Sequence, residues 1–202
     1  NQVISETRSA LDNYRFDHAA QAIYDFTWNE FCDWYIELSK VSLQSDDESI
    51  QRGARLTLLT VLETLLRLTH PIMPFITEEI WQMVAPLAGK MGDTIMLEAY
   101  PNVDGSQTNP DAVIEVDWVM SFILGVRRIR GEMNIAPGKP LRVVLQDVSD
   151  HDLIFLERNR TYLQKLGRLE SITILLSDDG GLESATALVG NLKILIPMAG
   201  LI

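Results

Sequence analysis

The 202-residue chain has a single cysteine, Cys32, so no disulfide can form within it. Its three histidines, His18, His70 and His151, lie far apart and lack the spacing of metal ligands. No apolar run reaches the roughly 20 residues of a membrane-spanning helix, and the first residues lack the basic and then apolar pattern of a secretory signal. We therefore expect a reducing, cytoplasmic location, no membrane partner and no metal site.

Positive charge is also scarce, because 17 Lys and Arg residues stand against 28 Asp and Glu residues, a net charge of −11. Broad binding to nucleic acid depends on many basic contacts to phosphate, so we exclude a general DNA-binding protein. Between residues 127 and 142 the balance reverses, and only Glu132 opposes the five basic residues Arg127, Arg128, Arg130, Lys139 and Arg142. This cluster indicates either a local contact with a polyanion or a solvated helix end, which the helix dipole favours.

Catalytic motifs are absent from the sequence. It contains no nucleophile elbow, no glycine-rich phosphate loop and no His/Glu metal pair. Cys32 would need a cationic neighbour to become a reactive thiolate, yet its helical neighbours are Asn29 and Asp33. We therefore predict no catalytic residue, no metal and no cofactor in this chain.

The first part of the sequence predicts antiparallel helices. Apolar residues recur with a period near 3.6, and capping residues and prolines divide them into helices over 2–13, 17–40 and 47–70. Asp17 is the expected N-cap of the second helix, and Pro71 ends the third. A short fourth helix should open at Thr77 and carry Trp81. Together these segments predict an antiparallel helical bundle over residues 1–95.

The second part changes character after a loop-like segment. Residues 96–110 are a predicted linker, with a short strand at 94–97 beside it. A helix over 111–133 should follow, then strands at 141–146 and 171–176 around a helix at 150–166. Two further strands, 185–189 and 192–196, flank Gly190 and Asn191, a pair suited to a tight hairpin. The expected fold is mainly α, an antiparallel helical bundle followed by a small α/β subdomain over 111–202.

The helix over residues 17–40 carries an unusual patch. At about 100° per residue, Cys32 and Ile36 project away from the main apolar stripe, with Trp28 and Glu37 beside them. An apolar strip bordered by carboxylates suits a nucleobase, which stacks on apolar surface and is read at its polar edge. A second packing face for a neighbouring helix explains the same pattern, and both interpretations remain open.

Several motifs resemble a known family. Residues 26–37 and 65–81 are similar to the anticodon-binding region of class I aminoacyl-tRNA synthetases for branched aliphatic amino acids. The second segment, with its His-Pro-Ile-Met-Pro-Phe-Ile-Thr-Glu-Glu-Ile-Trp motif, looks common to the valyl, isoleucyl and leucyl enzymes. The Phe-Cys-Asp-Trp-Tyr motif at 31–35 points to the valyl enzymes, and residues 128–141 and 197–202 are similar to bacterial valyl-tRNA synthetases. The resemblance covers essentially the whole chain.

The resemblance implies a longer, cytoplasmic parent enzyme that uses ATP and Mg²⁺ to join valine to tRNA(Val) and that edits mischarged product. The His-Ile-Gly-His and Lys-Met-Ser-Lys-Ser elements of its catalytic domain do not occur here. The parent is thus an expected valine–tRNA ligase, but this chain alone should not aminoacylate. The expected partners are tRNA(Val) and the other domains of the parent. In the family a first bundle helix would lie before Asn1 and a coiled-coil arm after Ile202.

With this resemblance, the patch becomes a candidate anticodon site. Cys32 and Ile36 would contact a base, and Trp28 would form a stacking wall. Glu37 would accept a hydrogen bond from an exocyclic amine such as that of cytosine, and Lys40 would meet phosphate. A second set of candidates for the tRNA backbone consists of Arg127, Arg128, Arg130 and Lys139. The alternative function is a noncatalytic scaffold that holds other domains or proteins.

Overall fold

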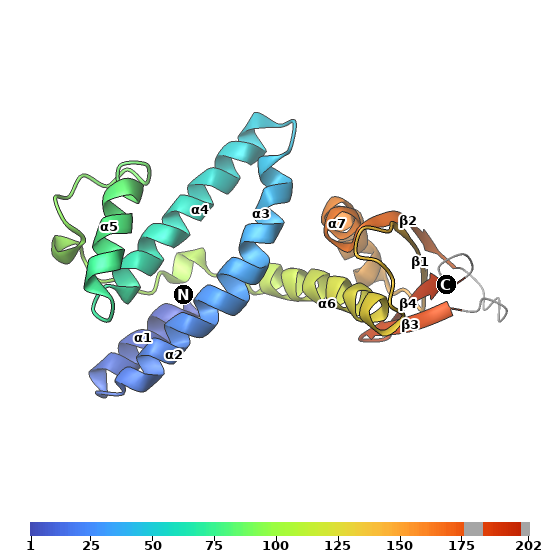
Figure 1. Ribbon diagram of the computed structural model, residues 1–202, viewed down its shortest axis with the longest axis horizontal. Coiled ribbons are helices and arrows are strands. Elements are labelled where there is room, and N and C mark those ends of the chain that lie inside the picture. The colour runs from blue at the N-terminus through green and yellow to red at the C-terminus, as the bar shows by residue number, and fades with distance from the viewer. Residues whose placement is uncertain (176–183, 199–202) are drawn as a thin grey trace. The chain divides into compact units, whose positions relative to one another are not determined.

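The computed structural model describes residues 1–175 and 184–198 (Figure 1). It divides the chain into two compact units, residues 1–108 and residues 109–202. Each unit has its own buried side chains.

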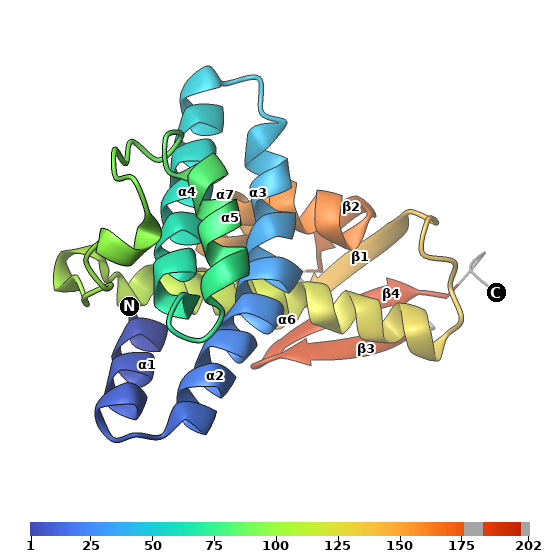
Figure 2. The same cartoon turned by 60° about the vertical axis from the view of Figure 1, so that its left-hand side comes forward.

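The first unit is built from helices. In chain order these are α1 (Gln2–Asp12), α2 (Phe16–Asp25), the π-helical segment η1 (Phe26–Tyr35), α3 (Ile36–Leu43), α4 (Glu48–Thr69), α5 (Pro74–Val84) and the short 3₁₀ turns η2 (Ile95–Leu97) and η3 (Gly105–Gln107). Consecutive helices pack as antiparallel neighbours, α1 on α2, α3 on α4 and α4 on α5 (Figures 1 and 2). Because α2, η1 and α3 follow one another without a break, they form one long helix over residues 16–43.

The starts of two helices differ from the sequence-based expectation. Arg15, not Asp17, is the N-cap of α2, and Asp17 lies in the first turn with its carboxylate 3.0 Å from the Arg15 guanidinium. Likewise α5 begins at Pro74 rather than Thr77. Proline fits the first helical position because the amide hydrogen that it lacks has no partner there. The predicted start of α4 near residue 47 is confirmed, because the helix begins at Glu48 and Asp47 is its N-cap.

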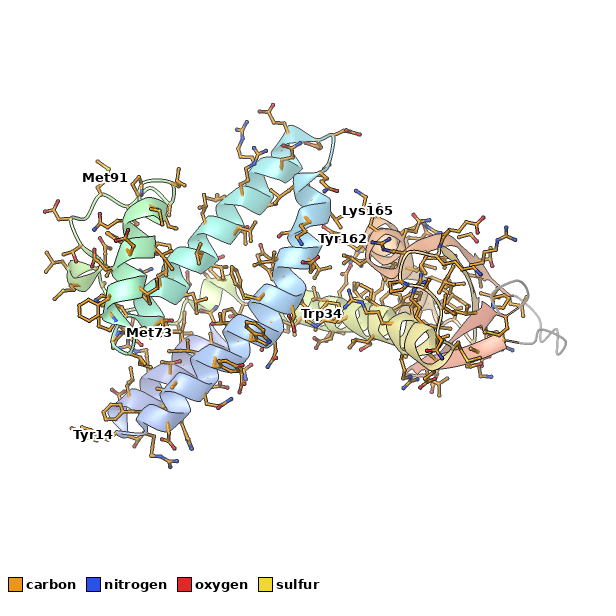
Figure 3. The ribbon with its side chains drawn as sticks, in the orientation of Figure 1. Tyr14, Trp34, Met73, Met91, Tyr162 and Lys165 are labelled. Atoms are coloured by element: carbon orange, nitrogen blue, oxygen red, sulfur yellow. The ribbon has the colours of Figure 1, made fainter. Side chains whose placement is uncertain are left out.

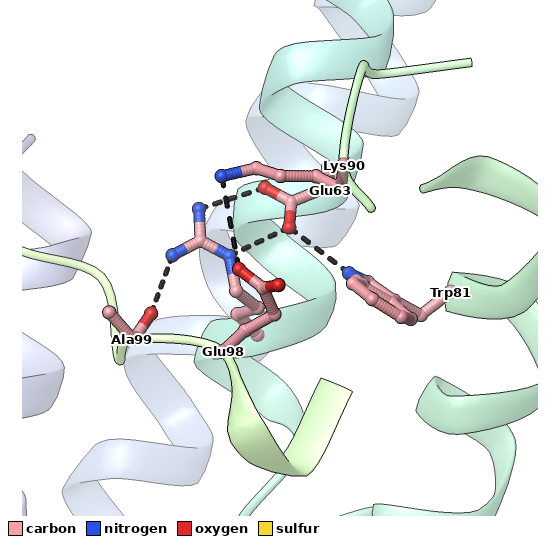
Figure 4. Close-up of polar contacts among 6 residues, drawn as sticks. Glu63, Trp81, Lys90, Glu98 and Ala99 are labelled. Atoms are coloured by element: carbon pink, nitrogen blue, oxygen red, sulfur yellow. Dashed lines mark hydrogen bonds and ion pairs between the residues drawn. The ribbon is translucent and has the colours of Figure 1, made fainter. Parts of the chain in front are cut away.

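A buried ion pair connects α4 to α5 and to the segment that follows α5 (Figure 4). Glu63 is 2% exposed, and its two carboxylate oxygens each accept a hydrogen bond of 2.8 Å from Arg67. Trp81 of α5 donates to the same carboxylate through Nε1 at 3.0 Å. Arg67 also donates to the carbonyl oxygen of Ala99 at 2.6 Å. The cluster therefore holds one side of α5 and the segment around Ala99 against α4.

The segment expected to be a linker carries structure. The predicted strand at 94–97 is wrong, because Ile95–Leu97 forms a 3₁₀ turn capped by Thr94. Further along, the Tyr100 hydroxyl donates to the Leu68 carbonyl at 2.9 Å, and Arg8 donates to the Pro101 carbonyl at 3.0 Å. Residues up to 108 thus belong to the first unit.

The second unit combines two helices with a small sheet. Its elements are α6 (Pro110–Glu132), β1 (Leu141–Gln146), α7 (Asp150–Gly167), β2 (Leu169–Ile174), β3 (Ser184–Val189) and β4 (Leu192–Pro197). The strand order is β2-β1-β4-β3, with β1 parallel to β2 and β4 antiparallel to both of its neighbours. Gly190 has φ of 59° in the β3–β4 turn, which confirms the predicted hairpin. Strand β2 begins two residues earlier than expected, and residue 176 lies outside the described residues.

Close packing of α6 on the sheet depends on a glycine. A side chain at Gly125 would place its Cβ 3.1 Å from that of Ala187 in β3.

Ser149 caps α7 through a capping box with Asp152. The fold is therefore mainly α with a small mixed four-stranded sheet, as the sequence predicts. Within the described residues, every helix is too short or too polar to cross a membrane.

Candidate nucleic-acid interface

The helix that carries the predicted anticodon site changes its hydrogen bonding in the middle. Over η1 the backbone forms i→i+5 bonds, and the amide of Ile36 donates to the carbonyl oxygen of Phe31. A π-helical turn is wider than an α-helical turn. A projection at 100° per residue therefore misplaces the side chains that lie on this segment and beyond it.

Cys32 and Ile36 show the effect. Both side chains are half-buried and pack against a core cluster that contains Ile23, Phe31 and Leu65. The expectation that they project away from the bundle is therefore wrong. Their packing against this cluster agrees with the packing-face alternative, and each retains partial access to solvent.

Two aromatic rings are more accessible than these residues. Tyr24 is 59% exposed and Trp28 is 57% exposed. Their rings are stacked with centroids 6.5 Å apart and planes 7° from parallel. Bases of single-stranded RNA stack on aromatic side chains in this way. Trp28 is one of the predicted contact residues, whereas Tyr24 was not predicted, although the i, i+4 spacing of the two aromatics is visible in the sequence.

Glu37 and Lys40 lie one turn apart on α3 and bind each other. Lys40 Nζ is 2.5 Å from Glu37 Oε1, and the two side chains are 54% and 41% exposed. An exposed ion pair contributes only about 0.2–1 kcal/mol. An RNA ligand can therefore replace this pair, with the carboxylate turning to a base amine and the ammonium turning to phosphate.

A second feature of the first unit is an apolar groove between α2, α4 and α5. Its volume is about 600 Å³, and apolar side chains dominate its lining. Ile72, Met73 and Ile76 lie at its edge and are each between 41% and 51% exposed. Met73 is labelled in Figure 3, in the turn before α5. The groove is large enough to accept several apolar side chains from another molecule or domain.

In the second unit, the four residues predicted to contact the tRNA backbone lie in different surroundings. Arg127 and Arg128 are exposed near the end of α6, and Arg128 lies 3.9 Å from Glu132. Lys139 is half-buried in the turn after α6. Arg130 is 9% exposed, which removes it from the surface.

Arg130 binds its own backbone instead of a ligand. Its Nη1 donates to the carbonyl oxygens of Ala136 and Lys139, and its Nη2 donates to those of Gly167 and Arg168, at 2.8–3.3 Å. The predicted contact between Arg130 and the tRNA backbone is therefore corrected, because this guanidinium fastens the 134–140 turn to the end of α7.

Most of the chain is similar to a known protein family. Residues 1–145 match the family described as the anticodon-binding domain of tRNA ligase. The chain belongs to this family. The match covers α1 to α6 and most of β1, so it includes the Tyr24–Trp28 pair, Glu37, Lys40 and the basic end of α6. An anticodon-binding domain has tRNA as its partner.

Metal binding has no visible site in this anticodon-binding domain. Within residues 1–175 and 184–198, no three His, Cys, Asp or Glu side chains are grouped to hold an ion.

Proposed function

We propose that this chain is the anticodon-binding region of a bacterial-type valyl-tRNA synthetase. In this role it positions tRNA(Val) for aminoacylation and editing, which other domains of the cytoplasmic parent enzyme carry out with ATP and Mg²⁺. The family match supports an anticodon-binding role, and the Phe-Cys-Asp-Trp-Tyr motif at 31–35 supports the valyl assignment.

The exposed Tyr24–Trp28 stack carries the proposal at the level of residues. Two large exposed aromatic rings leave apolar surface in contact with water, which is unfavourable unless a ligand covers it. A nucleobase fits because its flat face can stack against either ring. Glu37 lies further along the same helix and accepts a hydrogen bond from the base amine, while Lys40 meets phosphate. Cys32 and Ile36, which are half-buried between them, contribute packing under the base rather than its main contact.

The test measures tRNA binding by variants of the two rings. Trp28→Ala and Tyr24→Ala should each weaken binding of tRNA with the valine anticodon by roughly fivefold to a hundredfold, the range expected for one lost base–aromatic stack. In the full-length enzyme, ATP-dependent valine activation should not change, because it takes place elsewhere. Both rings are exposed, so thermal unfolding should shift little.

Phe75→Ala is the matched control, because Phe75 is an aromatic residue of the same unit that is 90% exposed on α5. It should leave tRNA binding unchanged. A tRNA with an altered anticodon should bind the wild-type chain more weakly. If the Trp28 and Tyr24 variants bind both tRNAs like wild type, the stack is not the anticodon site.

The apolar groove favours a second candidate function, a scaffold that holds another domain. Its occupant would be an amphipathic helix with basic flanks, because residues 1–108 carry 16 acidic and 7 basic groups. Ile76→Asp would then loosen the parent enzyme, measured as faster proteolysis between its domains, without changing the melting temperature of this chain alone. Unchanged proteolysis would leave the groove without this function.

A further inference from the structure

A pocket in the second unit collects arginines from segments that are distant in the sequence. Its volume is about 450 Å³, and it lies where the C-terminal ends of α6 and α7 meet the turn around Pro137. Arg127, Arg130 and Arg168 line it, and its other lining residues are Gly131, Ile135, Pro137, Leu166 and Gly167. Among the described residues, its lining contains no carboxylate. This is unusual in a chain with a net charge of −11.

The positive charge of this pocket is not cancelled by the helix ends. The C-terminus of a helix carries about half a negative charge, so two ends offset about one of the three arginine charges. The charge that they offset is that of Arg130, because its guanidinium donates to the carbonyl oxygens of Gly167 and Arg168 at the end of α7. Arg127 and Arg168 are both exposed and line the same pocket, so their guanidinium groups can reach a ligand there.

Arg168 also occupies a backbone position that suits glycine better. It is the C-cap of α7 with φ of 50° and ψ of 56°, in the left-handed region. Helices often end with glycine in this conformation because a Cβ is strained there. Here glycine stands one position earlier, where a Cβ at Gly167 would lie 3.0 Å from the Leu169 side chain.

The side chain of Arg168 is directed at the turn beside the pocket. Its Nη1 lies 3.7 Å from the position that a Cβ on Gly138 would take. Burial is the larger cause that lowers the pKa of Arg130, and the charge of the nearby Arg168 lowers it further. The structure thus places two like charges close together at a strained residue, an arrangement that an anion would stabilise.

We propose that the pocket of Arg127, Arg130 and Arg168 binds a phosphate group. Arg127 and Arg168 donate to the phosphate oxygens in the charge-assisted geometry that guanidinium groups favour. Arg130 contributes its charge from the pocket wall while its own hydrogen bonds hold the wall in place. The phosphate can come from an RNA backbone, which rests on the proposed function, or from a free phosphorylated compound, which does not.

Arg168→Gly provides a sharp test, because the two roles of this residue give opposite effects. Removing the left-handed strain should raise the melting temperature by about 4 °C. Removing the guanidinium should weaken phosphate binding by roughly tenfold. The backbone carbonyl of residue 168 remains for Arg130, so the pocket wall should persist. If Arg168 were only structural, its replacement would not change binding.

The experiment titrates the 202-residue chain with inorganic phosphate at constant ionic strength, following the arginine Nε–Hε signals by NMR. A second arm uses a short single-stranded RNA. Arg127→Ser should weaken binding in the same arms as Arg168→Gly. The matched control is Arg128→Ser, on the same helix but outside the pocket, and it should bind like wild type.

Saturable binding in either arm that both pocket variants weaken and the control does not would support the site. Binding of RNA identifies the backbone as the source, and binding of inorganic phosphate alone identifies a free compound. Failure of the proposed anticodon function would show separately, as unchanged tRNA binding in the Trp28 and Tyr24 variants. Equal binding by wild type, Arg127→Ser and Arg168→Gly in both arms would overturn the pocket.

Discussion

At the scale of single residues, Glu63 shows how a buried charge is retained in the bundle. Burial is the largest influence on this carboxyl group and raises its pKa, but hydrogen bonds from Arg67 and Trp81 and the charge of Arg67 together outweigh it. The pKa of Glu63 therefore lies below its ordinary value. The folded structure therefore stabilises the ionised form of Glu63.

Replacing this carboxylate should weaken the first unit strongly. Glu63→Gln should lower the free energy of unfolding by about 3 kcal/mol, because Arg67 would remain largely buried without an opposite charge. Chemical denaturation of the chain measures the loss. Glu48→Gln is the control on the same helix, since its pair with Arg52 is highly exposed and should contribute nothing measurable. Equal losses in the two variants would contradict this assignment.

The same residue predicts a pH dependence. Because the pKa of Glu63 is lower in the folded state, the unfolded chain binds its proton first as the pH falls. The stabilisation by Glu63 is therefore fully present above its ordinary value of 4.5 and is lost as the pH falls through the lower folded-state pKa. Unfolding of wild type and Glu63→Gln, compared between pH 7 and pH 3, should show a difference that shrinks only below pH 4.5. A constant difference would mean that the carboxylate charge is not its cause.

At the residue level, a side-chain contact can be read from the sequence only where a local spacing determines it. Tyr24 lies in α2 and Trp28 lies near the start of η1, and their i, i+4 spacing places the two rings together in an α-helical projection. Arg168 could not be predicted in the same way. Its neighbourhood with Arg127 and Arg130 arises only when α6, α7 and the Pro137 turn fold together.

At the scale of elements, the sequence predicts most helices and strands because their signals are local. Apolar period, capping residues and proline positions gave α1, α4, α6, β1, α7 and the β3–β4 hairpin within a few residues. The η1 segment was not predictable, because i→i+5 bonding has no apolar period of its own. Cys32, which lies within η1, and Ile36, which follows it, were consequently assigned to the wrong face.

Glycines in α4 and α6 should respond in opposite directions to larger side chains. Gly53 in α4 has no atom within 4 Å of an added Cβ, so Gly53→Ala should stabilise the chain by roughly 0.5–1 kcal/mol through helix propensity. At Gly125 in α6 the sheet is too close, with Ala187 at 3.1 Å. Gly125→Leu should therefore destabilise by about 2 kcal/mol through overpacking. Equilibrium denaturation tests both, and a stabilised Gly125→Leu would contradict the close packing of α6 on β3.

At the scale of the whole molecule, charge is distributed unevenly between the two units. Residues 1–108 have a net charge of −9, and residues 109–202 have a net charge of −2. We therefore expect little long-range attraction of RNA to this chain, and the proposed contact at the Tyr24–Trp28 stack would depend on those particular side chains. Few phosphate contacts also mean a weak salt dependence. On the proposed function, we expect base stacking to supply most of the affinity.

Because each unit buries apolar side chains of its own, a substitution in one core should mainly affect that unit. We expect Glu63→Gln to reduce the protection of backbone amides around Leu65 and Leu68, and to leave those of β1 and β4 unchanged. Gly125→Leu should have the reverse effect. Hydrogen exchange resolved by residue measures both patterns in one experiment. If either substitution lowered protection equally in both units, residues 1–202 would unfold as one cooperative body, and the boundary near residue 108 would have no energetic meaning.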